Sequence, residues 1–195
     1  MSALPSFDAV LLAGGRAARL GGIDKTALGA PGDTLLDRAV HAAAGARRTV
    51  LVGSREDART PTGIVLVRED PPFGGPVSGL AAGLGAVPAG APLTLVLACD
   101  LVRPVEAVTL LLRAVDPAGD DAERDGWVTV DDDGRRQPLL ALYRSTPLRT
   151  AVDSLDEVVG ASLRRLTAPL TLVEVPVPSA LCADVDTPDD AGRLT

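Results

Sequence analysis

Short apolar runs recur along the chain, and each is followed by a segment rich in glycine, proline or polar residues. The clearest runs cover residues 9–13, 49–52, 64–67 and 93–98. Their apolar character is continuous rather than alternating, which is typical of strands that are covered on both faces of a parallel sheet. The pattern therefore predicts four buried parallel strands in the first half of the chain.

Helical patterns separate these strands. Asp33 or Thr34 is suited to cap a helix whose apolar positions recur at helical spacing over residues 35–43. Pro104 suits the first turn of a second helix, and residues 80–84 are a shorter candidate. Alternating strands and helices predict right-handed crossovers and an α/β fold: a three-layer, doubly wound, Rossmann-like sheet that is mostly parallel.

The second half of the chain has a different pattern. Residues 127–143 contain two apolar runs around an Asp-Asp-Asp-Gly turn, which predicts a β-hairpin-like insertion. We expect helices around residues 147–154 and 162–167 and a strand near residues 172–175. A short terminal helix is expected to open at Thr187.

Composition narrows the class of protein. A chain of 195 residues suits one domain, and with 46% hydrophobic but only 2% aromatic residues its core must consist of leucine, valine and alanine. No segment has the roughly 18 unbroken apolar residues of a membrane span, and the first residues lack the pattern of a secretory signal. Cys99 and Cys182 match neither a disulfide framework nor a zinc spacing, and we expect Cys99 to be a buried apolar residue. We therefore expect a cytoplasmic protein.

The formal net charge of −7 argues against a nucleic-acid-binding protein, which normally carries a basic stripe. An anionic small ligand would instead need a local positive pocket. Of the 19 basic residues, every one is arginine except Lys25. Lysine and arginine differ most where a compact point charge must approach a ligand closely. Lys25 is therefore the first candidate for such a pocket.

The segment over residues 12–25 has the composition of an anion-binding loop. It carries four glycines, so its backbone N–H groups can approach phosphates closely and surround them. Arg16, Arg19 and Lys25 add three cations against the single Asp24. The spacing matches neither the P-loop nor the G-x-G-x-x-G pattern. A glycine-rich surface loop is the alternative interpretation.

Carboxylates and a rigid loop follow other predicted strands. Asp100 follows the strand over residues 93–98, where a lone carboxylate suits Mg²⁺, although it is also suited to cap the next helix. Asp184 or Asp186 could supply a second metal contact, and capping of a helix explains both equally well. The loop over residues 70–79 is rich in proline and glycine and could wall a base or ribose pocket.

These segments together resemble the molybdenum cofactor guanylyltransferases, within the wider nucleotidyltransferase superfamily. The resemblance spans nearly the whole chain and is carried by residues 12–25, 75–80, 99–100, 137–143 and 186–190. Leu20 stands where methionine is usual in the first motif. The family's metal motif usually continues with proline soon after the aspartate, whereas here Pro104 comes only after three further residues.

The resemblance implies one nucleotidyltransferase domain over residues 1–195, with a nucleotide-binding half over about residues 1–115 and an acceptor-binding half over about residues 116–195. It implies a Mg²⁺-dependent transfer of GMP from GTP to the phosphate of molybdopterin, with release of pyrophosphate. The expected nucleotide-binding residues are Leu12, Ala13, Gly14, Gly15, Arg16, Lys25, Asp70, Gly79 and Asp100. Among them Arg16, Lys25 and Asp100 are the expected catalytic residues, and Asp100 and Asp186 are the expected metal ligands.

The expected partners are GTP and a molybdopterin-type small molecule, with transient contact to cofactor-biosynthesis or acceptor proteins and with neither nucleic acid nor membrane. Three alternatives stay open. The first is the same chemistry with CTP and molybdopterin, or with GTP and a phosphorylated three-carbon acid of deazaflavin cofactor synthesis. The second is a nucleotide-binding adaptor without transferase activity. The third is a nucleotide-sugar pyrophosphorylase, for which the chain looks short.

Overall fold

A seven-stranded sheet forms the centre of the molecule in the computed structural model, which describes residues 6–13, 25–53, 62–87, 90–116 and 123–185. Its strands are β1 (Phe7–Leu12), β4 (Thr49–Val52), β5 (Ile64–Val67), β6 (Leu93–Ala98), β7 (Gly126–Val130), β8 (Arg136–Arg144) and β9 (Leu172–Pro176). Their order across the sheet is β5-β4-β1-β6-β8-β7-β9. Only β8 runs antiparallel to its neighbours β6 and β7, so the predicted mostly parallel sheet is confirmed.

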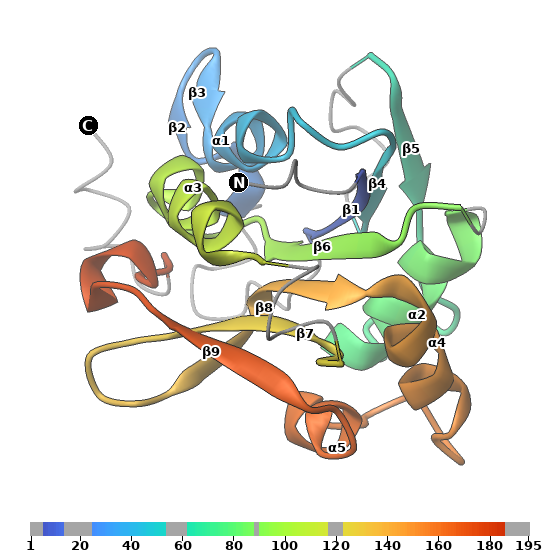
Figure 1. The fold of residues 1–195 in the computed structure, drawn as a ribbon. Coiled ribbons are helices and arrows are strands. Elements are labelled where there is room, and N and C mark those ends of the chain that lie inside the picture. Colours follow the sequence, from blue (N-terminus) through green and yellow to red (C-terminus); the bar gives the residue numbers. More distant parts are fainter. Residues whose placement is uncertain (1–5, 14–24, 54–61, 88–89, 117–122, 186–195) are drawn as a thin grey trace.

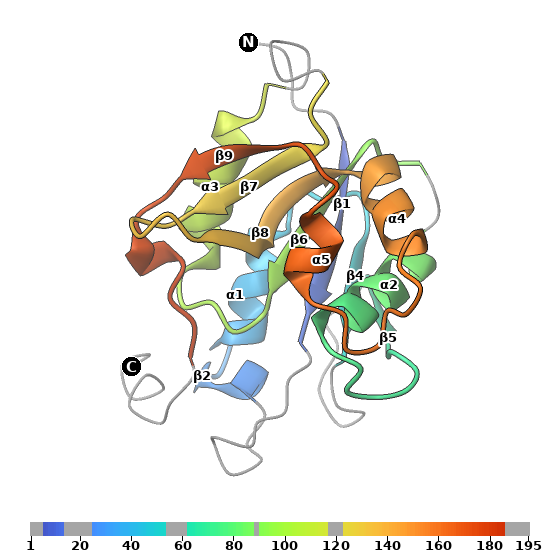
Figure 2. The same cartoon turned by 90° about the horizontal axis from the view of Figure 1, so that it is seen from below.

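Helices cover both faces of this sheet (Figures 1 and 2). On one face lie α1 (Leu35–Ala42) and α3 (Pro104–Ala114), and on the other lie α2 (Pro76–Ala86), α4 (Ser145–Asp153) and α5 (Leu163–Thr167). Smaller elements are the 3₁₀ turns η2 (Lys25–Ala27) and η3 (Ser179–Leu181), and the two-stranded hairpin of β2 (Gly29–Ala30) and β3 (Asp33–Thr34). The three-layer α/β fold expected from the sequence is confirmed.

The alternation of side chains along β1 explains why its apolar run is continuous. Ala9 and Leu11 belong to the core cluster beneath α1 and α3, whereas Val10 and Leu12 belong to the cluster beneath α2 and α4. Both faces must therefore be apolar. Strand β5 differs because it is one of the two edge strands of the sheet: Val65 and Leu66 keep 48% and 38% of their surface exposed. The expectation that this run is buried was wrong.

Helix ends follow the residues that the sequence singled out. Thr34 and Asp37 form a reciprocal capping box at the start of α1, and Pro104 begins α3. Helix α2 begins at Pro76 and ends at Ala86, so it is longer than the predicted segment over residues 80–84. Its glycines lower helix propensity, so the pattern did not predict its full length, but packing requires a glycine at position 83. A Cβ atom on Gly83 would lie only 2.5 Å from a methyl carbon of Val10.

The predicted hairpin is present as β7 and β8, and both strands are part of the main sheet, because β8 also pairs with β6. Cys99 is buried, as expected, and Trp127 on β7 is fully buried as well. The helix expected at Thr187 lies outside the described residues. Among the residues that the structure does describe, none of the helices is long and apolar enough to cross a bilayer.

Candidate nucleotide-binding site

The carboxyl ends of the central strands meet at one edge of the sheet. Leu12 at the end of β1 lies opposite Val52 of β4 and Ala98 of β6. Just beyond, the N–H of Ala13 donates to the carbonyl of Val52 at 2.8 Å and the N–H of Cys99 donates to that of Leu12 at 3.0 Å. The chain passes from β1 to β4 on one side and later returns to β6 on the other. The carboxyl edge between β1 and β6 is therefore the switch point at which open α/β sheets bind ligands.

A cavity of about 350 Å³ lies at this edge. That volume is within the range of small-molecule sites, roughly 300–1,000 Å³. Its lining residues are Leu12, Val52, Glu69, Phe73, Gly75, Pro76, Gly79, Ala98, Asp100 and Leu139. Most of these are apolar or are glycines, and two of them, Glu69 and Asp100, carry carboxylates. The cavity thus combines an apolar wall with a few charged groups, which is typical of a site for a small polar ligand.

Helix α2 points its amino end at the cavity, where Gly75, Pro76 and Gly79 form part of the lining. Gly75 precedes the helix with φ of 95°, a conformation that favours glycine, and as a glycine it has no side chain with which to cap the helix. At the far end, the guanidinium of Arg149 donates to the carbonyls of Leu84 and Val87 at 2.8 and 2.7 Å. The positive end of the helix dipole therefore faces the cavity, which favours a negatively charged ligand.

Lys25 and Asp100 come together at the same edge although 75 positions separate them in the sequence. The Nζ of Lys25 lies 4.0 Å from Oδ2 of Asp100, and the two side chains keep 20% and 33% of their surface exposed. An ion pair at that distance and exposure contributes little to folding. It does place a compact cation and a hard oxygen ligand next to one another at the cavity.

The loop after β6 is also tied to the C-terminal segment. The N–H of Val102 donates to the carbonyl of Ala183, and the N–H of Val185 donates to that of Asp100, both at 3.0 Å. Between them, Leu101 and Asp184 form an isolated antiparallel bridge. The exposed Asp184 therefore lies beside the loop that carries Asp100, whereas Asp186 lies outside the described residues.

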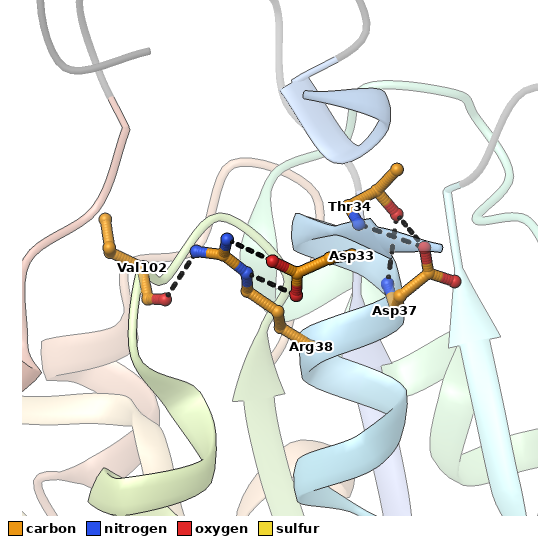
Figure 3. A network of polar contacts seen from close by, with 5 residues as sticks. All are labelled: Asp33, Thr34, Asp37, Arg38 and Val102. Carbon is orange, nitrogen blue, oxygen red and sulfur yellow. Dashed lines mark hydrogen bonds and ion pairs between the residues drawn. The ribbon is translucent and has the colours of Figure 1, made fainter. Parts of the chain in front are cut away.

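Arg38 on α1 connects this loop to the hairpin that follows Lys25 (Figure 3). Its Nε and one terminal nitrogen donate to both carboxylate oxygens of Asp33 at 2.9 and 2.6 Å, and the other terminal nitrogen donates to the carbonyl of Val102 at 3.2 Å. The hydrogen bonds from Arg38 hold the pKa of Asp33 below its usual value. Arg38 is therefore a positioning residue that fixes Val102, two positions beyond Asp100.

The structure brings some of the predicted binding residues to the cavity and leaves others outside its lining. Leu12, Gly79 and Asp100 line the cavity, and Lys25 lies beside Asp100. Asp70 is exposed and is not among the lining residues. The remaining described residue, Ala13, directly follows β1. The others, Gly14, Gly15, Arg16 and Asp186, lie outside the described residues.

The loop over residues 70–79 lines the cavity as expected, through Phe73, Gly75, Pro76 and Gly79, whereas Glu69 and Val52 were not expected. Glu69 lies one position before the loop over residues 70–79 that the sequence singled out, and within that loop Phe73 carries the large side chain. Leu139 comes from β8 and Val52 from β4. The sequence pointed to Phe73 indirectly, because this residue lies in the loop rich in proline and glycine that was expected to wall a pocket. Leu139 lies in the segment over residues 137–143 that carries the family resemblance, but its place at the cavity depends on the pairing of β8 with β6.

The charged groups fit a sparsely held Mg²⁺ ion better than a closed metal centre. Across the described ranges, no three His, Cys, Asp or Glu side chains gather as a metal-binding group. Mg²⁺ is commonly held by one or two carboxylates, with water and phosphate oxygens completing its shell. Asp100, next to the cavity, is suited to be such a carboxylate. Asp184 is the nearest further acidic candidate along the paired C-terminal segment.

A mostly parallel α/β sheet with a charged crevice at its switch point is the architecture in which ligands bind beyond the carboxyl ends of the strands. The chain belongs to the family of MobA-like NTP transferase domains, whose pattern it matches over residues 9–175. The resemblance to molybdenum cofactor guanylyltransferases is confirmed, and the protein is a nucleotidyltransferase of this family.

Similar proteins span almost the same length. A molybdenum cofactor guanylyltransferase of Cupriavidus metallidurans is 31% identical over 191 residues, which cover 93% of this chain and 90% of the relative. The fold is also that of the 2-C-methyl-D-erythritol 4-phosphate cytidylyltransferase of Francisella tularensis, with a TM-score of 0.72, 13% identity and coverage of 96% and 97% of the two chains. The manganese complex of Rv0371C from Mycobacterium tuberculosis has a TM-score of 0.68, 22% identity and 97% coverage of both chains. The fold is thus shared by proteins named for different bases.

Proposed function

We propose that the protein transfers GMP from GTP to the phosphate of molybdopterin and releases pyrophosphate, with Mg²⁺ as the metal ion. The observation that carries the proposal is the 4.0 Å approach of Lys25 to Asp100 at the edge of the cavity. A compact cation and a metal-binding carboxylate at one point suit a triphosphate that arrives with its metal. The name of the relatives that match most of the chain supports molybdopterin as the acceptor and GTP as the donor.

The proposed reaction needs no nucleophile from the protein. An oxygen of the molybdopterin phosphate forms a bond to the α-phosphorus of GTP, the bond from that phosphorus to the bridging oxygen of the β-phosphate breaks, and pyrophosphate leaves. Such a transfer is accelerated by positioning and by neutralisation of charge. When bound, Mg²⁺ would neutralise part of the phosphate charge beside Asp100.

Lys25, the amino end of α2 and the two halves of the chain each have a role in the proposed reaction. Lys25 exchanges its partner Asp100 for the phosphates of GTP, so that the carboxylate is left to the metal. The amino end of α2 adds a positive dipole to the same pocket. The part of the chain before about residue 115 holds the nucleotide, and the part after it holds the acceptor. Asp184, beside the Asp100 loop, comes from that second part.

The test is a pyrophosphate-release assay with purified protein, Mg²⁺, each of GTP, CTP, ATP and UTP, and molybdopterin or a phosphorylated three-carbon acid as acceptor. We expect release only with GTP and molybdopterin. Turnover of CTP with molybdopterin would overturn the choice of base, and turnover with the three-carbon acid would overturn the choice of acceptor. Tight binding of GTP without turnover on either acceptor would indicate an adaptor instead of an enzyme.

A further inference from the structure

We infer that Glu69 selects guanine and that Phe73 provides the surface on which the base stacks, an inference that rests on the proposed function of the cavity as a nucleotide site. Both residues follow β5 and line the cavity together with Leu12 and Val52. Because the register aligns Val67 at the end of β5 with Val52 and Leu12 at the ends of β4 and β1, the loop after β5 reaches the same edge as Asp100.

The carboxylate of Glu69 is oriented by its own loop. Its Oε1 accepts a hydrogen bond from the N–H of Phe73 at 3.1 Å. Phe73 has φ of 62°, which a non-glycine residue rarely adopts without a local reason. Here the turn aims the N–H of Phe73 back at Glu69. A carboxylate has about four lone-pair sites, so one such bond leaves most of its accepting capacity for a ligand.

The loop between these residues and α2 is held in place, which a specific base site requires. The carbonyl of Gly74 accepts a hydrogen bond from the N–H of Gly160 at 2.7 Å, from the connection between α4 and α5. Gly74 also packs so closely on α2 that an added Cβ would lie 2.6 Å from the Oγ of Ser78. The positions of Glu69 and Phe73 are therefore fixed relative to the helix that faces the cavity.

An ionised carboxylate only accepts hydrogen bonds, and this decides between the bases. The Watson–Crick edge of guanine presents two adjacent donors, the ring N1–H and the 2-amino group. The edge of cytosine presents its 4-amino donor next to N3, an acceptor that a carboxylate repels. Glu69 therefore favours guanine over cytosine, whereas Asp70, the next residue, is exposed and outside the lining.

The proposed role of Phe73 differs from that of Glu69, because it does not discriminate between bases. Phe73 is 66% exposed although it lines the cavity, so much of this apolar residue is accessible to a ligand. Stacking of a base on an aromatic ring tolerates any base, because every base has a π face. Phe73 thus contributes affinity for any nucleotide, and Glu69 contributes the choice among them.

The experiment measures dissociation constants by calorimetry for GTP, ITP and CTP, each with Mg²⁺, on the wild type, Glu69→Gln and Phe73→Ala. ITP lacks only the 2-amino group, so the wild type should bind it about fivefold or more weakly than GTP. Glu69→Gln should weaken GTP binding by about tenfold or more and should leave CTP unchanged or tighter, because an amide offers one donor and one acceptor side by side. Phe73→Ala should weaken GTP and CTP alike, by about fivefold or more. Glu123→Gln, an exposed carboxylate away from the cavity lining, is the matched control and should bind all three as the wild type does.

Equal affinity of the wild type for GTP and ITP, or a wild type that prefers CTP, would overturn the inference without any variant having to fold. Equal losses of GTP and CTP in Glu69→Gln would also overturn it. The two proposals fail separately: a protein that reads guanine through Glu69 but transfers no GMP to molybdopterin would contradict only the proposed reaction.

Discussion

Two regions of the molecule gather carboxylates, and they use them in opposite ways. In the turn between β7 and β8, Asp131 accepts hydrogen bonds from the N–H groups of Asp133 and Arg135 and from the amide of Gln137 at 2.8–3.1 Å. At the carboxyl edge of the sheet, Asp100 instead lines a cavity, 4.0 Å from the amine of Lys25. A carboxylate whose oxygens are taken up by its own turn stabilises that turn. A carboxylate that lines a cavity beside a cation is suited to a ligand.

The turn between β7 and β8 also forms hydrogen bonds with η3, the 3₁₀ turn that follows β9. Asp132 and Ser179 exchange two hydrogen bonds, at 2.8 and 3.1 Å, between the turn and η3. These hydrogen bonds hold the pKa of Asp132 below its usual value. Acidic sequence alone does not tell the two regions apart, since Asp-Asp-Asp-Gly looks richer in potential ligands than the single Asp100. Their surroundings separate them, because Asp131 accepts hydrogen bonds from its own turn whereas Asp100 lines a cavity beside Lys25.

The largest effect should come from Asp100→Asn, which keeps the size of the side chain and removes its charge. We expect turnover to fall by at least about 100-fold, on the scale of a lost charge-stabilising group in a transition state. Steady-state pyrophosphate release measures it, with circular dichroism to show that the fold is kept. Asp132→Asn, in the other region, is the control and should stay within twofold of the wild type. Similar losses in both variants would remove the distinction between the regions.

Lys25→Ala should have the next largest effect. Removal of the only lysine should weaken GTP binding and turnover by at least tenfold, about 1.4 kcal/mol or more. Arg113→Ala, an exposed cation on α3 away from the cavity, should change neither quantity. Calorimetry with GTP and the same turnover assay measure both variants. An unchanged affinity for GTP in Lys25→Ala would contradict its assignment to the phosphates.

Asp131→Ala should have the opposite effect to Asp100→Asn: it should lower the stability of the fold and leave turnover unchanged. Loss of the acceptor for three hydrogen-bond donors should lower the free energy of unfolding by about 1–2 kcal/mol. Urea denaturation measures this change, and turnover below the unfolding transition should equal that of the wild type. Lost turnover in a folded Asp131→Ala protein would place the turn in the active site.

Arg38→Ala tests the residue that positions the Asp100 loop. Because its bond to the carbonyl of Val102 is only one of several that hold the loop, kcat should fall by only about threefold, with the KM for GTP within twofold. Arg38→Lys should recover only part of the loss, since lysine cannot bind Asp33 and Val102 together as a fork. A rise in KM with unchanged kcat would contradict a positioning role and indicate a binding role.

The smallest effect should be seen in the pH dependence of stability. The pKa of Asp132 is lowered in the folded state, so its contribution is present above the ordinary aspartate pKa of about 3.9 and is lost as pH falls through the lowered value. Asp132→Asn removes this contribution. The difference in Tm between wild type and variant should therefore shrink as pH falls from 5 toward 3. A difference that stays constant over this range would show that the charge of Asp132 does not stabilise the fold.

Much of the architecture could be predicted from local patterns. The places of strands β1, β4, β5 and β6, the cap at Thr34 and the proline that begins α3 were predicted correctly, because they depend on residues within a few positions of one another. The length of α2 could not be predicted, since its glycines lower helix propensity and the reason for Gly83 is its close packing against Val10 and Val52. The exposure of β5 could not be predicted either, because a run of apolar residues looks the same in an edge strand and in a central strand.

Lys25 and Asp100 could be chosen from the sequence alone as the candidates for phosphate and metal binding, because their chemistry and their places after apolar strands are local properties. Their approach to 4.0 Å was decided by the tertiary structure, as was the presence of Glu69 and Leu139 at one cavity. The order of strands across the sheet decides which loops meet, and that order depends on the packing of helices and strands from the whole chain. A local pattern carries no information about such long-range contacts.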